Sequence, residues 1–350
     1  MEKNHYSQLE QAINSKFFGI LPDGKEVSCY TLSNKNGMEL SIINYGATIT
    51  SIKIPVSDHE NVDVVLGFDN LQAYMDSFDL PSPPYMGTVI GRFAGRINEG
   101  KFTLNGKTIQ LARNHGEHHL HGGNNGFSQQ FWNVKNSTND DYPSLTFTYT
   151  SQNNEENYPG ILMIEVTYKL TETNQVIVEY HARSTEDTIL NLTQHSYFNL
   201  EGHQKDTSNQ LLFVNAVKTL ETDSKNIPTG LFLNVSNCTF DFTEQKKCPT
   251  SIDNSFVLDK KTKIAASLYS EKTQLKMIVY TNQHAVHIYV GGNCFGKING
   301  KENASYHTQS GICFETQNFP DAPNHPNFPS CILRQGEIYH HQTIYAFEKI

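Results

Sequence analysis

The sequence lacks several features that would assign it to common classes of protein. No uninterrupted apolar run approaches the roughly 18 residues that a membrane-spanning helix needs. The N-terminal stretch has polar and acidic residues where a secretory signal would have a basic segment and an apolar core. The 27 Lys and Arg against 36 Asp and Glu leave no basic field for a nucleic acid. We therefore expect a cytoplasmic protein that binds neither membranes nor nucleic acids.

Cofactor and disulfide motifs are also missing. The 23 glycines form no G-x-G-x-x-G and no Walker-type loop, so the sequence predicts no dinucleotide or nucleotide cofactor. The 6 cysteines lie far apart and form no C-x-x-C motif, which argues against a disulfide framework and against a zinc ribbon. We expect buried or idle thiols.

Helical periodicity is scarce in this chain. Residues 7–18 and residues 69–76 are the two stretches that predict helices, the second with Asp69 as its N-cap. No linker rich in Pro, Ser or Gly divides the chain, and no internal repeat is visible. We expect an N-terminal extension over residues 1–25, with room for one helix, followed by a single domain over residues 26–350.

Alternating strand patterns dominate what remains. In the stretch ILMIEVTYKL, one face carries Ile164, Val166 and Tyr168 while polar residues occupy the other. The stretch KFTLNGKTIQL sets two short strands around Asn105 and Gly106, a pair typical of a type I′ hairpin turn. Many strands with intervening turns and few helices predict an all-β protein, built as a large antiparallel β-sandwich.

The stretch NLTQHSYFNL raises the question of function, because it lines up polar groups on one face of an apolar strand. Alternation groups Asn191, Thr193, His195, Tyr197 and Asn199. A solvated face of a half-buried strand accounts for this pattern. These side chains, however, carry no full charge at neutral pH and offer both donors and acceptors, which suits a neutral, hydroxyl-rich ligand. The stripe alone does not decide between the two interpretations.

Three charged residues stand among apolar neighbours. Arg92 and Arg96 lie in GTVIGRFAGRINEGKF, where an arginine either ties a loop to carbonyl groups or donates to the oxygens of a ligand. Glu315 lies in GICFETQNFPDAP, where a strand would bury it in part. A desolvated carboxyl group has a raised pKa and becomes a better base near neutral pH, but it can equally form a structural ion pair.

Four histidines follow one another closely in NHGEHHLHGG. Several imidazoles at this spacing can bind a metal ion, yet no Cys, Asp or H-E-x-x-H helix supports such a site. A single histidine that donates a hydrogen bond at the edge of a pocket, with the others solvated, is the simpler interpretation. The histidines are His115, His118, His119 and His121.

Seven stretches, taken together, resemble the aldose 1-epimerase (galactose mutarotase) family. They follow in the family's order from residue 44 to residue 347, so the resemblance covers most of the chain. The stretches are NYGATITSIKIP, DVVLGFDNLQAY, GRFAGRINEGKFTLNG, LHGGNNGFSQQFW, NLTQHSYFNLEG, SIDNSFVL and the long C-terminal run that begins GICFETQNFPDAPN.

The resemblance implies a galactose mutarotase-like sandwich that interconverts the α and β anomers of free aldohexoses such as galactose and glucose. It implies no metal or other cofactor. The general acid of the family corresponds to His195, in HSYFNL, and the general base to Glu315, in ETQNFPDAPN. We expect the sugar to be bound by Arg96, His121, Tyr197, Asp253 and His287.

Three positions depart from the residues that the family usually carries. Gly95 replaces Asn, Asn254 replaces His, and His287 replaces Gln. Because these positions line or approach the expected pocket, the preferred sugar stays open. Two alternatives remain at this level: an epimerase for a hexose phosphate or another aldose, and a catalytically silent carbohydrate-binding protein on the same fold. The sequence does not indicate an oligomeric state.

Overall fold

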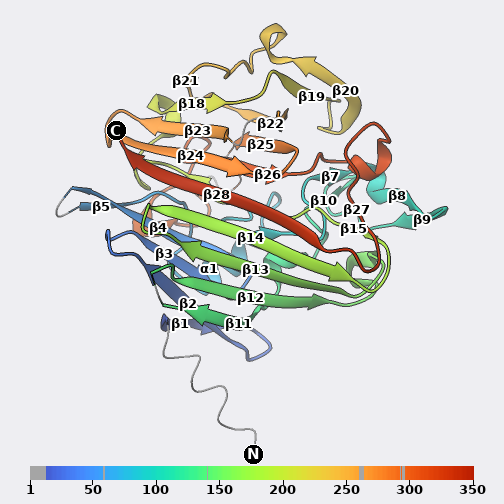
Figure 1. Cartoon of the computed structure of the whole chain (residues 1–350), viewed down its shortest axis with the longest axis horizontal. Coiled ribbons are helices and arrows are strands. Elements are labelled where there is room, and N and C mark those ends of the chain that lie inside the picture. The colour runs from blue at the N-terminus through green and yellow to red at the C-terminus, as the bar shows by residue number, and fades with distance from the viewer. Residues whose placement is uncertain (1–12, 58–59, 140, 260–263, 292, 294–295) are drawn as a thin grey trace, which may run out of the picture.

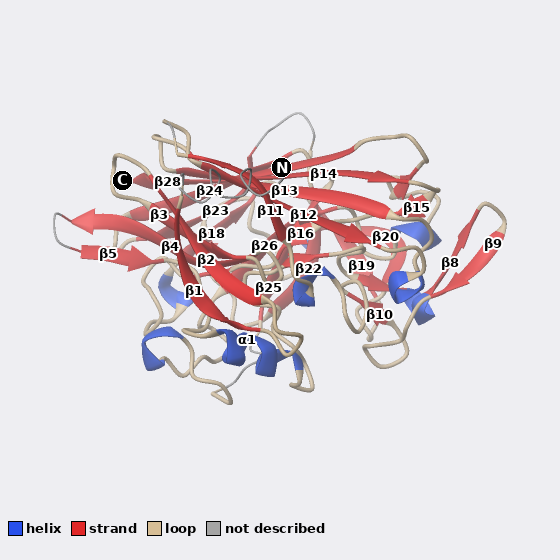
Figure 2. Cartoon of the chain, turned by 90° about the horizontal axis from the view of Figure 1, so that it is seen from below, coloured by secondary structure: helices blue, strands red, loops and turns tan. Residues whose placement is uncertain are grey.

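The computed structural model describes residues 13–57, 60–139, 141–259, 264–291, 293 and 296–350. Antiparallel sheets make up most of its regular structure and lie in layers (Figures 1 and 2). The largest sheet has nine strands, in the order β11 (Asn133–Thr138), β12 (Ser144–Ser151), β13 (Leu162–Leu170), β14 (Gln175–Ser184), β28 (Tyr339–Lys349), β24 (Leu275–Thr281), β23 (Ile264–Ser270), β18 (Leu211–Val214) and β21 (Lys246–Lys247).

Two further sheets complete the sandwich. The six-stranded sheet has the order β17 (Tyr197–Phe198), β26 (Ile312–Gln317), β25 (Ala285–Val290), β22 (Ile252–Val257), β19 (Lys218–Thr222) and β20 (Pro228–Asn234). The five-stranded sheet has the order β1 (Asn14–Ile20), β2 (Glu26–Ser33), β3 (Glu39–Ile43), β4 (Thr48–Ser57) and β5 (Glu60–Asp63). The core lies between the sheets, where Val166 of β13, Phe314 of β26 and Ile42 of β3 belong to one apolar cluster.

Short elements connect the large sheets. Two-stranded ladders join β6 (Val89–Ile90) to β16 (Thr193–Gln194), β7 (Arg96–Ile97) to β10 (His119–Leu120), β8 (Lys101–Leu104) to β9 (Lys107–Gln110), and β15 (Thr188–Ile189) to β27 (Ile332–Leu333). The helix α1 spans Leu71–Phe78, and short 3₁₀ turns lie at Asn98–Gly100, Phe127–Gln129, Glu155–Asn157, Thr207–Asn209, Val235–Asn237, Lys301–Asn303 and Ala322–Asn324.

The strand and hairpin predictions are confirmed. In β13 the residues Ile164, Val166 and Tyr168 are buried while their neighbours are more exposed, as alternation requires. Asn105 and Gly106 both have positive φ, of 51° and 75°, and connect β8 to β9. These patterns are local, so the sequence suffices to predict them.

The predicted N-terminal helix is wrong where the structure describes it. Residues 14–18 lie in β1, whose register with β2 places Lys16 opposite Cys29, and residues 7–12 fall outside the described residues. An isolated helix of about 12 residues is marginal in water, so pairing with β2 outweighs the weak helical periodicity.

The predicted helix at residues 69–76 exists with shifted bounds. α1 begins at Leu71, and its N-cap is Asn70 rather than Asp69. The Asn70 side chain accepts a hydrogen bond from the Ala73 N–H at 2.9 Å. Both residue types are good N-caps, so the burial of Leu71 and Tyr74 decides where the helix starts.

The described cysteines are free thiols. Cys29, Cys248, Cys313 and Cys331 are buried and Cys238 is half-buried, while Cys294 lies outside the described residues. Among the described residues, no helix combines the length and apolarity that crossing a membrane would need.

Candidate active site

A pocket of about 260 Å³ lies against the six-stranded sheet. Three adjacent strands form its polar floor, with Asp253 from β22, His287 and Tyr289 from β25, and Glu315 and Gln317 from β26. Side chains alternate along a strand, so neighbours of these residues such as Ile288 and Phe314 reach into the core instead. The six-stranded sheet therefore separates the hydrophobic core from a polar pocket.

Glu315 and His195 face each other inside this pocket. The Nε2 atom of His195 lies 3.6 Å from Oε1 of Glu315, and the two side chains are only 5% and 3% exposed. The backbone of His195 is fixed by hydrogen bonds to Thr88 and Gly87, at 3.0 and 2.9 Å. Among the described residues, no hydrogen bond reaches the Glu315 carboxylate, so its oxygens are available to a bound molecule.

Aromatic rings surround the His195 imidazole. The ring centroids of Tyr85, His121 and Tyr197 lie 5.9, 5.4 and 5.2 Å from its own. Tyr85 and His121 line the pocket together with His195, whereas Tyr197 is not among the lining residues. Tyr197 is 2% exposed and packs against the imidazole, which gives it a supporting position.

His121 enters the pocket directly after β10, whose ladder with β7 places Leu120 opposite Arg96. The Gly95 N–H donates to Nδ1 of His121 at 3.3 Å, so the neutral ring carries its proton on Nε2. Burial, reinforced by the charges of His195 and Arg96, holds the pKa of His121 well below its usual value. His121 is therefore a neutral donor.

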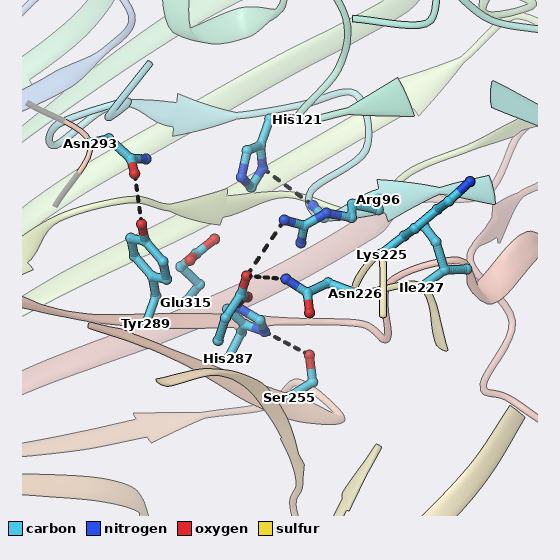
Figure 3. Close-up of polar contacts among 12 residues, drawn as sticks. Arg96, His121, Lys225, Asn226, Ile227, Ser255, His287, Tyr289, Asn293 and Glu315 are labelled. Atoms are coloured by element: carbon cyan, nitrogen blue, oxygen red, sulfur yellow. Dashed lines mark hydrogen bonds and ion pairs between the residues drawn. The ribbon is translucent and has the colours of Figure 1, made fainter. Parts of the chain in front are cut away.

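Asp253 is surrounded by donors. These are Arg96, Asn226 and His287, whose side chains lie close together in the pocket (Figure 3). Its Oδ1 accepts from Nε2 of His287 at 2.8 Å, and its Oδ2 accepts from Asn226 at 2.9 Å and lies 3.5 Å from Nη2 of Arg96. Burial raises the pKa of Asp253, but the His287 hydrogen bond and the charges of His287 and Arg96 hold it well below its usual range. Asp253 is thus a fixed anion.

His287 bridges two protein groups. Its Nδ1 lies 2.8 Å from Oγ of Ser255, and its Nε2 is bound to Asp253. Burial lowers the pKa of His287, but the hydrogen bond to Asp253 and the charges of Asp253 and Glu315 together raise it above its usual value. Both ring nitrogens have protein partners, so His287 shapes the pocket mainly by orienting Asp253.

The two arginines have different environments. Arg92 is 2% exposed and donates to Ser151, to the Gln152 carbonyl and to the Pro159 carbonyl, at 2.8 to 3.1 Å. Arg92 therefore ties loops together through their carbonyl groups, which is the first of the two roles that the sequence allows. Arg96 lines the pocket instead, and its Nε is a buried atom with no partner among the described residues.

Comparisons with known proteins identify the family of this chain. The family model described as aldose 1-epimerase matches residues 28–346. A galactose mutarotase from Bos taurus is 35% identical, over 96% of this chain and 98% of the relative, and an aldose 1-epimerase from Escherichia coli K12 is 32% identical over 94% and 97%. The chain belongs to the aldose 1-epimerase family.

Solved structures of the family have the same fold. A GalM/aldose epimerase homologue from C. elegans superposes with a TM-score of 0.85 at 28% identity, covering 96% of this chain and 100% of the other. A galactose 1-epimerase from Lactobacillus acidophilus gives 0.83 at 26% identity, covering 97% and 99%. The prediction of an antiparallel, galactose mutarotase-like sandwich is confirmed.

The polar stripe around His195 is neither a solvated strand face nor, as a whole, a wall of the pocket. Every residue from 190 to 200 is buried, so the stripe is not a solvated face. Asn191 is bonded to the backbone of Ala94 and Asn318, and Asn199 to that of Lys205 and Ser310. Of the stripe, His195 lines the pocket. The alternating pattern did not reveal that this stretch forms two separate short strands, β16 and β17, or that the asparagines on either side of them bind neighbouring loops.

The histidine cluster also differs from the prediction that most of it is solvated. His118 and His119 are buried, and His119 is bonded to the Ala112 carbonyl at 2.7 Å and to the Tyr158 hydroxyl at 2.6 Å. His121, His195 and Glu315 have ligand atoms within 4.8 Å of one another and could together hold a divalent cation. Among the described residues, the other histidines of the cluster belong to no such group.

Several pocket residues were not predicted. Tyr85 follows the proline-rich loop, Asn293 accepts from the Tyr289 hydroxyl at 2.8 Å, and Gln317 lies two positions after Glu315 on the same face. Alternation along β26 could have identified Gln317. Tyr85 and Asn293 belong to loops, and no sequence pattern places loops over a pocket.

Of the three departures from the family pattern, the glycine at position 95 is explained by the conformation of the backbone. Its φ is +81°, and a Cβ there would lie 3.0 Å from Pro320. An asparagine would need both a left-handed backbone and a shift of this proline.

Proposed function

We propose that the protein is an aldose 1-epimerase that interconverts the α and β anomers of free aldohexoses, with galactose and glucose as substrates. The observation that carries this proposal is the pair formed by His195 and Glu315, 3.6 Å apart in a polar pocket. The carboxylate has no hydrogen bond among the described residues, so it is free to accept a proton from a substrate.

The chemistry explains why such a pair is needed. A base takes the proton of the C1 hydroxyl while an acid protonates the ring oxygen, and the ring opens to the aldehyde. Rotation about the C1–C2 bond and reclosure then produce the other anomer, with the two groups exchanging roles. Both oxygens are bonded to C1, so the acid and the base must lie close together. Each positioned group contributes about 10²–10⁴-fold in rate.

Glu315 is the base and His195 the acid of the ring-opening step. Neutral His121 donates through Nε2–H to a sugar oxygen, and Asp253 forms a fixed negative side of the pocket. Holding the sugar in one orientation removes unproductive geometries. In this scheme Tyr197 supports the His195 ring and His287 orients Asp253.

Two unpaired atoms also support a hydroxyl-rich ligand. Nε of Arg96 and Oε1 of Gln317 are buried in residues that line the pocket, and neither has a partner in the described part of the chain. Leaving a buried polar atom unpaired costs about 1–3 kcal/mol. Sugar hydroxyls both donate and accept, so they can satisfy a donor and an acceptor at once.

The charge of the pocket favours a neutral sugar over a sugar phosphate. Among the described lining residues, Arg96 is the one with a permanent positive charge, and Asp253 lies 3.5 Å from it. A phosphate group prefers unpaired cationic donors. No observation favours the silent carbohydrate-binding alternative, because both candidate catalytic groups are present and face each other.

The test is polarimetry on freshly dissolved α-D-galactose and, separately, α-D-glucose. We expect the protein to accelerate the decay to the equilibrium rotation, and Glu315→Gln and His195→Asn each to reduce this acceleration by about 10²–10⁴-fold. Glu244→Gln and His307→Asn are matched controls at exposed positions and should keep full activity. A folded wild-type protein that accelerates neither sugar would refute the proposal.

The roles assigned above to the site residues are predictions, and three further expectations from the sequence also remain predictions. They are the cytoplasmic location, the absence of a cofactor, and the assignment of residues 26–350 to one catalytic domain. Strand β1 pairs with β2, so residues 14–20 belong to the same five-stranded sheet as the residues that follow.

A further inference from the structure

The outer face of the nine-stranded sheet carries a group of metal-ligand side chains that the proposed function does not use. Glu179 and His181 lie on β14 and His340 lies on β28, two strands that run side by side near the middle of this sheet (Figure 1). Residues that alternate with them, such as Val178 and His341, are buried. The three side chains therefore point away from the core.

The strand register brings the three side chains together. His181 is directly opposite His340 in the ladder, and Glu179 precedes His181 by two residues on the same face. The two imidazoles are stacked, with centroids 4.9 Å apart and planes inclined by 27°. Nε2 of His340 lies 2.8 Å from Oε1 of Glu179. One ligand atom from each residue can be chosen so that all three lie within 4.8 Å of one another.

We propose that Glu179, His181 and His340 form a binding site for a divalent cation of the zinc class, with its remaining coordination positions open to water. Two imidazoles and one carboxylate are a donor set that zinc uses in proteins, and imidazole also suits Cu²⁺ and Ni²⁺. Mg²⁺ and Ca²⁺ prefer oxygen ligands and do not match it.

An ordinary solvated face explains the cluster less well. Stacked imidazoles repel each other when both are protonated. Glu179 is bonded to His340, and the carboxylate opposite His181, that of Glu165, is already paired with Lys135. A cation between the three groups is attracted to the carboxylate and to the lone pairs of both neutral rings. Binding through Nε2 of His340 would replace its hydrogen bond to Glu179 with two metal bonds, and the single proton of the neutral ring would then be carried by Nδ1.

The site needs only small side-chain movements to close. Bonds of about 2.0–2.1 Å to a tetrahedral ion place donor atoms roughly 3.3 Å apart. The side chains of His340 and Glu179 are 45% and 30% exposed, so they can rotate to this spacing. The backbone is held by β13 on one side and β24 on the other. The strands thus fix the Cα positions while the side chains adjust.

A second group of potential ligands has to be separated from this one. His121, His195 and Glu315 in the pocket also have ligand atoms within 4.8 Å of one another. The experiment therefore uses His195→Asn protein as a second background, in which the pocket group is incomplete. The inference does not rest on the proposed function, because none of the three outer residues lines the pocket.

The test is calorimetric titration of the full chain with ZnCl₂. We expect the wild-type protein and His195→Asn to show the same zinc-binding event. Its affinity should fall by about 10–100-fold or more in each of the variants His181→Gln, His340→Gln and Glu179→Gln, because loss of even a group that supports a metal ligand weakens binding by this factor. His307→Gln, a matched exposed histidine beside Asp206, should bind as the wild type does. Mutarotation in the three outer variants, measured without zinc, should be unchanged.

Two further measurements keep the proposal falsifiable if a variant folds poorly. Bound Cu²⁺ in the His195→Asn protein should give an electron paramagnetic resonance spectrum with coupling to two imidazole nitrogens. Gln342→His adds an imidazole opposite Glu179 and should tighten zinc binding by about tenfold or more. The proposal is overturned if zinc binding is undiminished in His181→Gln and His340→Gln, if no ion binds below millimolar concentration, or if Gln342→His has no effect.

Discussion

Two carboxylate–imidazole pairs lie in the same pocket and differ in how completely they are bonded. The Asp253 carboxylate accepts hydrogen bonds from His287 and Asn226 and lies near Arg96, and the second nitrogen of His287 is in turn held by Ser255. The Glu315 carboxylate lies 3.6 Å from His195, with no hydrogen bond from the described residues.

In the proposed mechanism, this difference assigns the two carboxylates different roles: Asp253 helps to bind the sugar, and Glu315 transfers a proton. A carboxylate with a full set of donors has a depressed pKa and keeps its charge and position, which suits a fixed wall. A carboxylate without donors can form a new bond to a substrate proton without first breaking an existing one. One sheet thus provides both a rigid anion, on β22, and a reactive one, on β26, with β25 between them.

The largest expected effect tests this separation directly. Glu315→Gln should lower kcat by about 10²–10⁴-fold, because it removes the base. Asp253→Asn should lower kcat/KM by about 10–100-fold, mainly through KM, because a hydrogen bond to a charged group contributes about 1.5–3 kcal/mol. Initial polarimetric rates over a range of galactose concentrations distinguish the two. An equal loss of kcat in both variants would contradict the division.

A third buried carboxylate, outside the pocket, tests how much an ion pair contributes to stability where no catalysis is involved. Asp63 accepts from Lys301 at 2.7 Å and from Ser51 at 2.8 Å, outside the pocket. Lys301→Met leaves this charge without its main partner and should lower the free energy of unfolding by about 3–5 kcal/mol, while the folded fraction keeps its activity. Urea denaturation measures the loss. The double variant Asp63→Asn/Lys301→Met should recover part of it, and a double variant as unstable as Lys301→Met would argue against this cause.

The pH dependence of stability tests the Asp253–His287 pair. The pKa of His287 is raised in the folded protein, so its contribution is complete below the unfolded value of about 6.5 and is lost as the pH rises through the folded value. The pKa of Asp253 is depressed, so its contribution is present above about 3.9 and is lost as the pH falls.

His287→Gln should therefore flatten the alkaline side of the stability profile. Between about pH 6 and pH 9, we expect the wild type to lose about 1 kcal/mol more than the variant, on the scale of one hydrogen bond. Chemical denaturation at a series of pH values measures this difference. Parallel profiles for the two proteins would show that the proton on His287 does not stabilise the fold.

The smallest expected effect comes from an exposed pair. Lys135 and Glu165 form an ion pair on the surface, with side chains 49% and 40% exposed. Lys135→Gln should lower the free energy of unfolding by less than about 1 kcal/mol, because water screens the interaction. A loss as large as that of Lys301→Met would mean that burial does not set the strength of these pairs.

Local patterns predicted much of the fold. Alternation in β13 and the Asn105–Gly106 turn depend on neighbouring residues, so the sequence contains the information needed. The helix predicted at residues 7–18 is wrong for residues 14–18, because these residues form β1, which is stabilised by β2, a partner that local periodicity does not include. The shift of the N-cap to Asn70 has the same origin, since burial of α1 selects between two good caps.

The candidate site was predicted in its residue types more than in its contacts. His195, Glu315, Arg96, His121 and Asp253 line one pocket, although they come from separate parts of the chain. Tyr197 and Asn191 were grouped with His195 by alternation, yet one packs behind the imidazole and the other binds loop carbonyls. Alternation assigns a face to a residue, but it does not say what covers that face.

The sequence by itself determined that the protein is rich in β-strands and where the turn of the β8–β9 hairpin lies. It also showed which residues have the chemistry to exchange protons with a sugar. Those properties follow from side-chain type and from spacing along the chain. Only the tertiary structure decided that Glu315 receives no hydrogen bond from the described residues while Asp253 is surrounded by donors, and that His181 lies opposite His340, a residue far away in the sequence. Such differences depend on which strands become neighbours, and that choice is made by the packing of the whole sandwich.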